Sequence, residues 1–379
     1  MRIGIVTFIG YNNYGNRLQN YALQCLLEQY GAEVETILND NYYDYHYIKG
    51  HYPERLIHMI KAVFWRIYDG ICHDEHAMGY MLKSDSLTKL RIKRNLEFSK
   101  KYIKESNFII REGNFHRDAM QRYDYVVTGS DQVWNPTMAG ASELFFLTFV
   151  PQSKRIALSA SIGLEHIPEK YLKQWKIYLS GMNYISVREE SAKKIVEETS
   201  DKKAEVLLDP TMLVDDGIWI NLMNDREGNL PSKYMLTYIL GSIEESEQES
   251  IARISGSEKL ELVELNNRKY EDLYSLDVIM FLKYIANAEV VITDSFHACV
   301  FSILFKREFY VFKRKGVYSN IYSRIDDLLK RFGLEERAIS SLCGWKRYEL
   351  SSAQKENIDL VLMKEREKAD SFLRKILYQ

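Results

Sequence analysis

Short β-forming runs alternate with helical segments along most of the chain, and this alternation restricts the fold more than any other feature. Residues 2–8, RIGIVTF, are rich in β-branched residues and are predicted to form a strand. Apolar residues then recur at helical spacing from Leu18 to Leu26, and residues 34–37 form a second β-rich run. A strand, a helix and a strand in this order are typical of a parallel sheet, because parallel neighbours need a crossover connection. The sequence therefore predicts an α/β fold.

The alternation occurs twice, which predicts two domains. Strands are predicted again at 125–128 and 155–161, and a second series of strands and helices begins with a predicted strand at 184–188. We therefore expect two Rossmann-like β/α/β domains that face a cleft, where a ligand can be shared. The expected boundaries are 1–180 for the N-terminal domain with a helical insertion at about 41–120, 181–340 for the C-terminal domain, and 341–379 for a helical tail whose final helix covers 353–377.

The composition excludes several classes of function. With 51 basic and 53 acidic residues the formal charge is −2, so nothing indicates nucleic-acid binding. The cysteines stand apart, and DxD, HExxH and P-loop motifs are missing, so we expect neither a catalytic metal nor a cofactor. Neither a signal peptide nor an apolar run of about 18 residues is present. We therefore expect a cytoplasmic protein.

Polar residues directly follow the predicted strand in YDYVVTGSDQVWNP, residues 123–136. Gly129, Ser130 and Asp131 stand at its carboxyl end, which is where open α/β sheets bind their ligands. Asp131 could be a general base or could bind sugar hydroxyls. The structural alternative is a helix N-cap or an Asx turn, both of which favour aspartate.

The strongest single signal is VVITDSFHACVFSILF, residues 290–305. A buried strand is expected to lead to Asp294 and Ser295, and His297 stands just inside a strongly apolar helix. The helix N-terminus favours a phosphate, and a protonated histidine can donate to it. The alternative is a structural histidine beside an apolar face.

Three further stretches carry candidate residues. Arg188 ends a predicted strand and can bind a carboxylate or phosphate with two hydrogen bonds. The structural alternative is an ion pair at the surface with one of the acids at 189 and 190. A basic cluster at 313–315 follows another predicted strand. The asparagine-rich loop at 8–23 precedes a helix, but its GYNNYGN sequence is not the glycine pattern of a dinucleotide site.

Five stretches, taken in order over residues 1–335, resemble the polysaccharide pyruvyl transferase family: NNYGNRLQNYAL, DYVVTGSDQVWNP, SVREESAKKI, LLDPTMLV and ITDSFHACVFSILFK. The resemblance implies a two-domain GT-B-like fold. It also implies a transferase that moves the pyruvyl group of phosphoenolpyruvate (PEP) as a ketal onto a sugar of a surface polysaccharide, such as a capsule, or its lipid-linked precursor.

The resemblance also implies roles for the candidate residues. His297 would assist the leaving phosphate as a general acid, and Asp131 would take the proton of the attacking hydroxyl. The N-terminal domain would bind the acceptor and the C-terminal domain would bind PEP. The other expected substrate-binding residues are Asn13, Asn16, Gln19, Ser130, Arg188, Asp294, Ser295, Lys313 and Arg314.

One position departs from the family pattern. Some members carry an arginine two residues before the histidine, where this chain has Ser295. Either other cations replace it or the donor differs from PEP. Two alternatives therefore stay open: a GT-B glycosyltransferase that uses a nucleotide sugar, and a non-catalytic module of polysaccharide assembly. The stretch 47–71 mixes basic and aromatic residues and could lie against an anionic membrane at its inner face, although packing on the domain also explains it.

Overall fold

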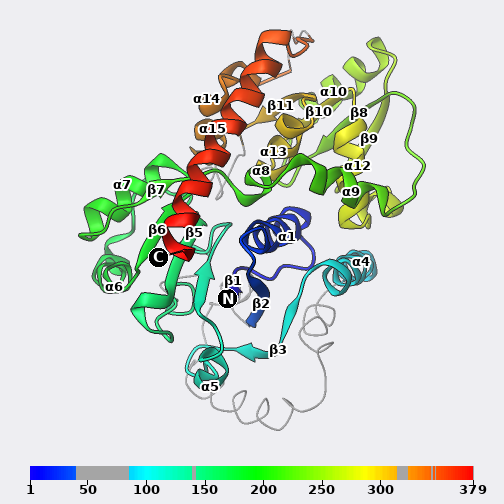
Figure 1. Cartoon of the computed structure of the whole chain (residues 1–379). Coiled ribbons are helices and arrows are strands. Elements are labelled where there is room, and N and C mark those ends of the chain that lie inside the picture. Colours follow the sequence, from blue (N-terminus) through cyan, green and yellow to red (C-terminus); the bar gives the residue numbers. More distant parts are fainter. Residues whose placement is uncertain (40–84, 139–141, 314–322, 343–344, 346, 379) are drawn as a thin grey trace.

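The computed structural model describes residues 1–39, 85–138, 142–313, 323–342, 345 and 347–378 (Figure 1). Its first sheet has seven strands, all paired in parallel, in the order β3-β2-β1-β4-β5-β6-β7. The strands are β1 (Arg2–Val6), β2 (Glu33–Asn39), β3 (Glu105–Ile110), β4 (Tyr125–Thr128), β5 (Arg155–Ala160), β6 (Tyr184–Val187) and β7 (Glu205–Val206).

The second sheet of the described chain has five parallel strands in the order β12-β11-β10-β8-β9. The strands are β8 (Tyr234–Tyr238), β9 (Glu261–Leu265), β10 (Val290–Thr293), β11 (Glu308–Phe312) and β12 (Ala338–Ile339). Its central strand β10 reads VVIT and is buried throughout, as expected for a parallel strand covered on both faces. The prediction of an α/β fold with two parallel sheets is confirmed.

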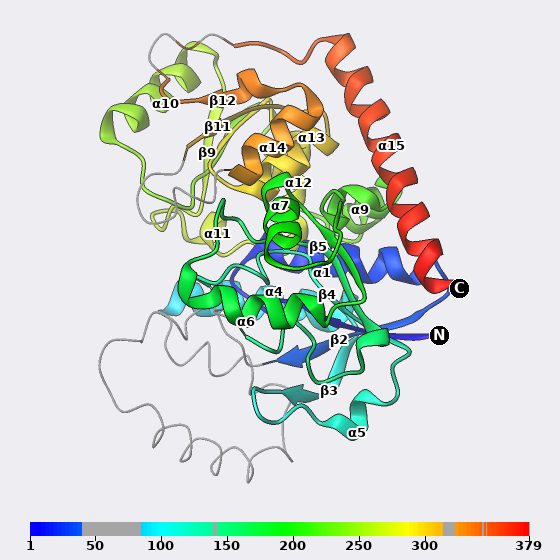
Figure 2. The ribbon, with the colours of Figure 1, turned by 90° about the vertical axis from the view of Figure 1, so that its left-hand side faces the viewer.

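Helices connect the strands and cover both sheets (Figures 1 and 2). The helices of the first half are α1 (Tyr14–Glu28), α4 (Ser86–Tyr102), α5 (Arg117–Met120), α6 (Glu169–Ser180), α7 (Glu190–Thr199) and the 3₁₀ turn η2 (Gln152–Lys154). Those that follow are α8 (Pro210–Leu213), α9 (Asp216–Asn224), α10 (Glu245–Ser257), α11 (Glu271–Tyr274), α12 (Val278–Asn287), α13 (Phe296–Leu304), α14 (Ser323–Phe332), η4 (Glu335–Arg337) and α15 (Ser352–Leu377).

Two sequence-based expectations about the sheets are wrong. The strand predicted to open the second sheet is β6, which pairs with β5 of the first sheet (Ile156 opposite Tyr184) after the crossover helix α6. Residues 105–110, expected within a helical insertion, form the edge strand β3. An edge strand is only partly covered, so its sequence, ESNFII, lacks the continuous apolar run that would identify it. Residues 40–84, which include the basic and aromatic stretch, lie outside the described residues.

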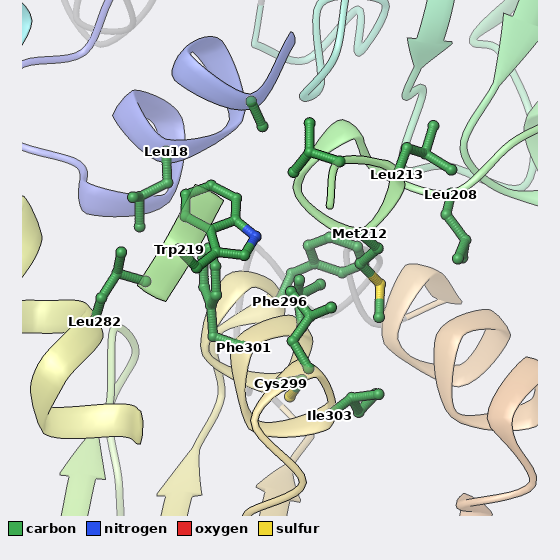
Figure 3. Close-up of a cluster of buried hydrophobic side chains, with 14 of the residues drawn as sticks. Leu18, Leu208, Met212, Leu213, Trp219, Leu282, Phe296, Cys299, Phe301 and Ile303 are labelled. Atoms are coloured by element: carbon green, nitrogen blue, oxygen red, sulfur yellow. The ribbon is translucent and has the colours of Figure 1, made fainter. Parts of the chain in front are cut away.

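The two halves share an apolar cluster (Figure 3). Leu18 of α1 points into it beside Trp219 of α9, whose ring contacts Phe301 of α13 with centroids 5.0 Å apart. Leu282 of α12 lies in the same cluster, and all four side chains are fully buried. Burying such side chains contributes about 1.5–3 kcal/mol each, so this cluster fixes the position of α1 against the second half.

The last helix, α15, crosses from the second half back to the first (Figures 1 and 2). It begins with a capping box between Ser351 and Gln354, and near its end the Ile376 carbonyl accepts a hydrogen bond from the hydroxyl of Tyr125 on β4. The predicted final helix is therefore confirmed, and it packs on the first sheet domain. Among the described helices none is both long and apolar enough to span a bilayer.

Candidate functional site

A buried carboxylate, Asp209, lies where several polar loop ends meet. It follows β7 and caps α8, with Pro210 at the first helical position. Its Oδ1 accepts hydrogen bonds from the backbone N–H and the hydroxyl of Thr211, at 3.1 and 2.7 Å. Its Oδ2 accepts from Ser130 Oγ at 2.8 Å and from Arg188 Nη1 at 2.6 Å. Both oxygens of the Asp209 side chain therefore act only as hydrogen-bond acceptors, as in an ionised carboxylate.

The charge of Asp209 is set by its neighbours. Burial by itself would raise the pKa of Asp209, but the charge of Arg188, the charge of His297 when it is protonated, and the hydrogen bonds from Thr211 lower it to about 2. The carboxylate is therefore ionised at neutral pH and forms an ion pair with Arg188 inside the protein.

Arg188 directly follows β6 and is buried, with 5% of its surface exposed. Its guanidinium carbon lies 4.3 Å from the centroid of the Phe296 ring. Among the described residues, its Nε and Nη2 have no hydrogen-bond partner. The pairing that the sequence left open is therefore not at the surface: Arg188 is buried, donates one hydrogen bond to Asp209, lies 4.0 Å from the buried Glu189 carboxylate, and has two nitrogens that make no hydrogen bond among the described residues.

Glu189, beside Arg188, is also buried rather than placed at the surface. Its Oε1 accepts from Ser161 Oγ at 3.0 Å and from the backbone N–H groups of Ile162 and Gly163 at 2.8 and 2.9 Å. Its Oε2 lies 4.0 Å from Arg188 Nε. Glu189 thus fixes the loop after β5 while its charge faces the arginine.

His297 comes from the other half of the chain, in the first turn of α13. Its Nε2 lies 3.9 Å from Asp209 Oδ2 and has no hydrogen-bond partner among the described residues. Burial lowers the pKa of His297, and the positive charges of Arg188 and Arg324 lower it further. The negative charges of Asp209 and Asp131 raise it and so oppose this effect. The imidazole is therefore neutral at neutral pH, with carboxylates close enough to stabilise its protonated form.

Asp131 is held by the asparagine-rich loop. Asn16 Oδ1 accepts from Gly10 N at 2.9 Å and from Arg17 Nη2 at 2.8 Å, so its amide nitrogen must point the other way. That nitrogen donates to Asp131 Oδ2 at 3.2 Å. Asp131 Oδ1 accepts from Gln132 N at 2.8 Å, and Asp131 has a left-handed backbone with φ 63°. Asp131 is therefore oriented by neighbours on both of its oxygens.

A close approach joins the N-terminus of α1 to the imidazole of His297. A Cβ atom built on Gly15 would lie 2.3 Å from His297 Nδ1 and 2.8 Å from its Cβ. Real Cβ atoms do not come this close, so only glycine fits here. The N-termini of α1 and α13 thus meet at His297, and each offers backbone N–H groups that favour an anion.

The structure brings five of the predicted residues into this cluster: Asn16, Ser130, Asp131, Arg188 and His297.

The other predicted residues have structural contacts or lie elsewhere. Asn13 caps α1, and Gln19 donates to Thr7 Oγ1 at 3.1 Å. Asp294 accepts from the N–H groups of Leu240 and Gly241, both at 2.7 Å, and Ser295 caps α13. Lys313 is exposed after β11, and Arg314 lies outside the described residues.

Sequence reasoning missed three members of the cluster. Asp209 stands in LLDPTMLV at the end of a strand, and its Asp-Pro pair was a signal only for a helix start. Phe296 and Arg324 gave no signal, because an apolar residue and a lone arginine are ordinary in helices.

The cluster is also separate from the cavity of about 740 Å³ lined by residues 113–119 and Glu143. Among the described residues no group of three or more histidine, cysteine or acidic side chains could hold a metal ion.

Comparison with solved structures gives similar proteins at low identity. UDP-GlcNAc 2-epimerase from Neisseria meningitidis has a TM-score of 0.46 and 11% identity, covering 100% of this chain and 94% of its own. The Methanocaldococcus jannaschii UDP-GlcNAc 2-epimerase has a TM-score of 0.44 and 14% identity, with coverages of 97% and 93%. E. coli ADP-heptose LPS heptosyltransferase II has a TM-score of 0.36 and 10% identity, with coverages of 96% and 99%.

Comparison with curated proteins gives no match. The family model described as polysaccharide pyruvyl transferase matches residues 13–316, a span that contains Asn16, Ser130, Asp131, Arg188, Asp209 and His297. The family resemblance seen in the sequence is confirmed, and the chain belongs to the polysaccharide pyruvyl transferase family.

Proposed function

We propose that this protein transfers the pyruvyl group of PEP onto two hydroxyl groups of a sugar, forming a ketal and releasing phosphate. The observation that supports this most is Arg188, which is buried beside His297 and has two guanidinium donors left after pairing with Asp209. PEP carries a carboxylate and a phosphate, and a planar guanidinium binds either group with two hydrogen bonds. The proposed acceptor is a sugar of a surface polysaccharide or its lipid-linked precursor, met in the cytoplasm.

The proposed chemistry uses the two carboxylates and the imidazole in turn. A sugar hydroxyl attacks C2 of PEP while C3 takes up a proton from solvent, and Asp131 accepts the proton of that hydroxyl. A second hydroxyl then displaces phosphate from C2 and loses its proton to solvent, so the C2–O bond to phosphate breaks. His297 donates a proton to the departing phosphate, and the negative charges of Asp209 and Asp131 stabilise its protonated form beforehand.

A labelling experiment tests this reaction. PEP labelled with ¹⁸O in the bridging oxygen is incubated with the protein and a panel of sugars and lipid-linked sugars that carry free vicinal or 4,6-hydroxyl pairs. Pyruvyl transfer predicts the label in released phosphate and a ketal carbon in the product. Turnover of UDP- or GDP-sugars without consumption of PEP would instead identify a glycosyltransferase.

Arg188→Lys should lower kcat/KM for PEP by about 10²-fold or more. Lysine keeps the charge that pairs with Asp209, but it loses the planar fork, and hydrogen bonds to charged groups are worth roughly 1.5–3 kcal/mol each. Steady-state kinetics measure the effect. The matched control is Arg122→Lys, because Arg122 also pairs with a carboxylate, Glu35, and lies against Phe108 and Tyr123 outside the cluster. Equal losses in both variants would contradict the proposed role of Arg188.

Binding of PEP should be linked to proton uptake by His297. In the free protein burial lowers the pKa of His297, so the imidazole is neutral at pH 7. A bound anion favours the charged imidazole and raises that pKa, so affinity should increase as the pH falls toward the pKa of the free protein. Calorimetry in buffers with different ionisation enthalpies measures the protons taken up. His297→Gln should take up fewer protons than the unmodified protein; identical uptake by both would rule out this linkage.

A further inference from the structure

A fully buried arginine at the start of α1 lies behind the asparagine that holds Asp131. This residue, Arg17, connects the loop after β1 to the edge strand β3. Its Nη2 donates to the carbonyl oxygen of Phe8 at 3.1 Å, and its Nη1 lies 3.6 Å from Oε1 of Glu105 on β3. Burying a guanidinium without partners is costly, so these contacts keep the charged group in place inside the protein.

Arg17 also fixes the orientation of the Asn16 amide. Its Nη2 and Nε both donate to Asn16 Oδ1, at 2.8 and 3.3 Å, and the backbone N–H of Gly10 donates to the same oxygen. A reversed amide would set its own N–H groups against these donors. The amide therefore has one orientation, in which Nδ2 is directed at Asp131 Oδ2.

The Asp131 carboxylate depends on this amide for one of its two oxygens. Within the described part of the chain, Asn16 Nδ2 is the one hydrogen-bond donor to Asp131 Oδ2, while Oδ1 is held by the N–H of Gln132. The charge of Arg17 acts on the same carboxylate: burial lowers the pKa of Arg17, and Asp131 is among the neighbours that raise it. The orientation of Asp131 thus follows from that of Asn16, and the orientation of Asn16 follows from Arg17.

We propose that Arg17 is a positioning residue that acts on Asp131 through the side chain of Asn16. Arg17 is fully buried and touches neither substrate, so its effect reaches the reaction only through these two neighbours. The inference rests on the proposed function, in which Asp131 takes the proton of the attacking sugar hydroxyl. Disturbing Arg17 should therefore lower kcat and leave the affinity for PEP unchanged, because Arg188 and not Asp131 binds PEP.

A double-mutant cycle tests the route through Asn16. Arg17→Lys keeps the positive charge but loses the fork that contacts Asn16 Oδ1, so kcat should fall about tenfold or more, since a displacement of about 1 Å can cost 10²-fold in rate. Asn16→Leu removes the amide and should lower kcat at least as much. In the Asn16→Leu protein, Arg17→Lys should have little further effect, because the residue through which it acts is gone. Additive losses would contradict this route.

The matched control is Arg337→Lys. Arg337 is also buried, donates to the carbonyl oxygen of Tyr348 at 2.6 Å, and lies 3.4 Å from a glutamate, Glu336, and over the ring of Tyr310. None of its described contacts is with the cluster. This variant should lower stability and leave kcat unchanged. Equal losses of kcat in Arg337→Lys and Arg17→Lys would show that the arginine matters only for the fold.

NMR of the Asn16 side-chain amide supplies a readout that needs no substrate. The N–H group that donates to Asp131 should exchange slowly with solvent in the unmodified protein and in Arg337→Lys, and faster in Arg17→Lys. Faster exchange without turnover of PEP by any variant would support the positioning and reject the proposed function. Exchange equal to that of the unmodified protein, or faster exchange with unchanged kcat, would overturn the positioning and leave pyruvyl transfer intact.

A milder variant serves if Arg17→Lys does not fold. The side chain of Glu105 is 16% exposed, so Glu105→Gln removes a charge beside Arg17 without emptying the buried position. It should give the same pattern in the double-mutant cycle and in amide exchange, with smaller losses. Unchanged exchange and unchanged kcat in Glu105→Gln would overturn the positioning role.

Discussion

Asp209→Asn should lower the free energy of unfolding by about 3–5 kcal/mol and abolish activity. Asparagine is as good an N-cap as aspartate, so the start of α8 should survive and the loss should come from the charge. The four hydrogen bonds that reach Asp209 come from Thr211, Ser130 and Arg188. An amide turns one acceptor into a donor, and it leaves the buried Arg188 without its hydrogen-bonded counter-ion, with only the Glu189 carboxylate at 4.0 Å.

Denaturant unfolding measures this effect, and Asp216→Asn is its control. Asp216 also forms an ion pair with an arginine, Arg366, but its side chain is 53% exposed. Exposed pairs contribute about 0–1 kcal/mol, so this substitution should change stability by no more than that. A loss below about 1 kcal/mol for Asp209→Asn would mean that the Arg188–Asp209 pair is not the centre of the cluster.

Gly15→Ala should lower kcat/KM by about 10²-fold or more while the protein still folds. The new methyl group would lie 2.3–2.8 Å from three atoms of His297, so the imidazole or the start of α1 must move. Overpacking of this kind costs about 1–3 kcal/mol, and a displacement of about 1 Å at a catalytic group can cost 10²-fold in rate. Steady-state kinetics measure the loss of kcat/KM, and the NMR signals of His297 measure the displacement of the imidazole.

The control for this variant is the same substitution in another helix. Gly256 lies in α10, and a Cβ atom there meets nothing within 4 Å. Gly256→Ala should therefore raise stability by about 0.5–1 kcal/mol and leave activity unchanged, because alanine is the better helix former. Full activity in Gly15→Ala would show that His297 does not need its present position.

The sequence predicts the local parts of this molecule well. Val290–Thr293 is a continuous β-branched run, so the strand β10 and the turn that presents His297 follow from local preferences. The loop with Asn16 and the loop with Asp131 were likewise found as polar segments after strands. In each of these cases the residues that indicate the strand or loop lie within it or directly beside it in the sequence.

Features that depend on distant pairing could not be predicted in this way. Arg188 is buried because β7 pairs beside β6 and brings Asp209 to it, and nothing near Arg188 in the sequence states that pairing. The closeness of Arg188, Phe296 and Arg324 requires three elements from both halves to meet. The edge strand β3 was missed because partial exposure permits polar residues within it.

A calorimetric titration of the unmodified protein shows whether the cluster around Arg188 and His297 binds PEP. PEP, UDP-sugars and GDP-sugars are titrated separately at low salt. We predict saturable binding of PEP with a Kd of about 1 mM or tighter, the range of ordinary enzyme substrates, together with competition by inorganic phosphate. Binding of a nucleotide sugar with no detectable binding of PEP would rule out pyruvyl transfer from PEP as the function of this cluster.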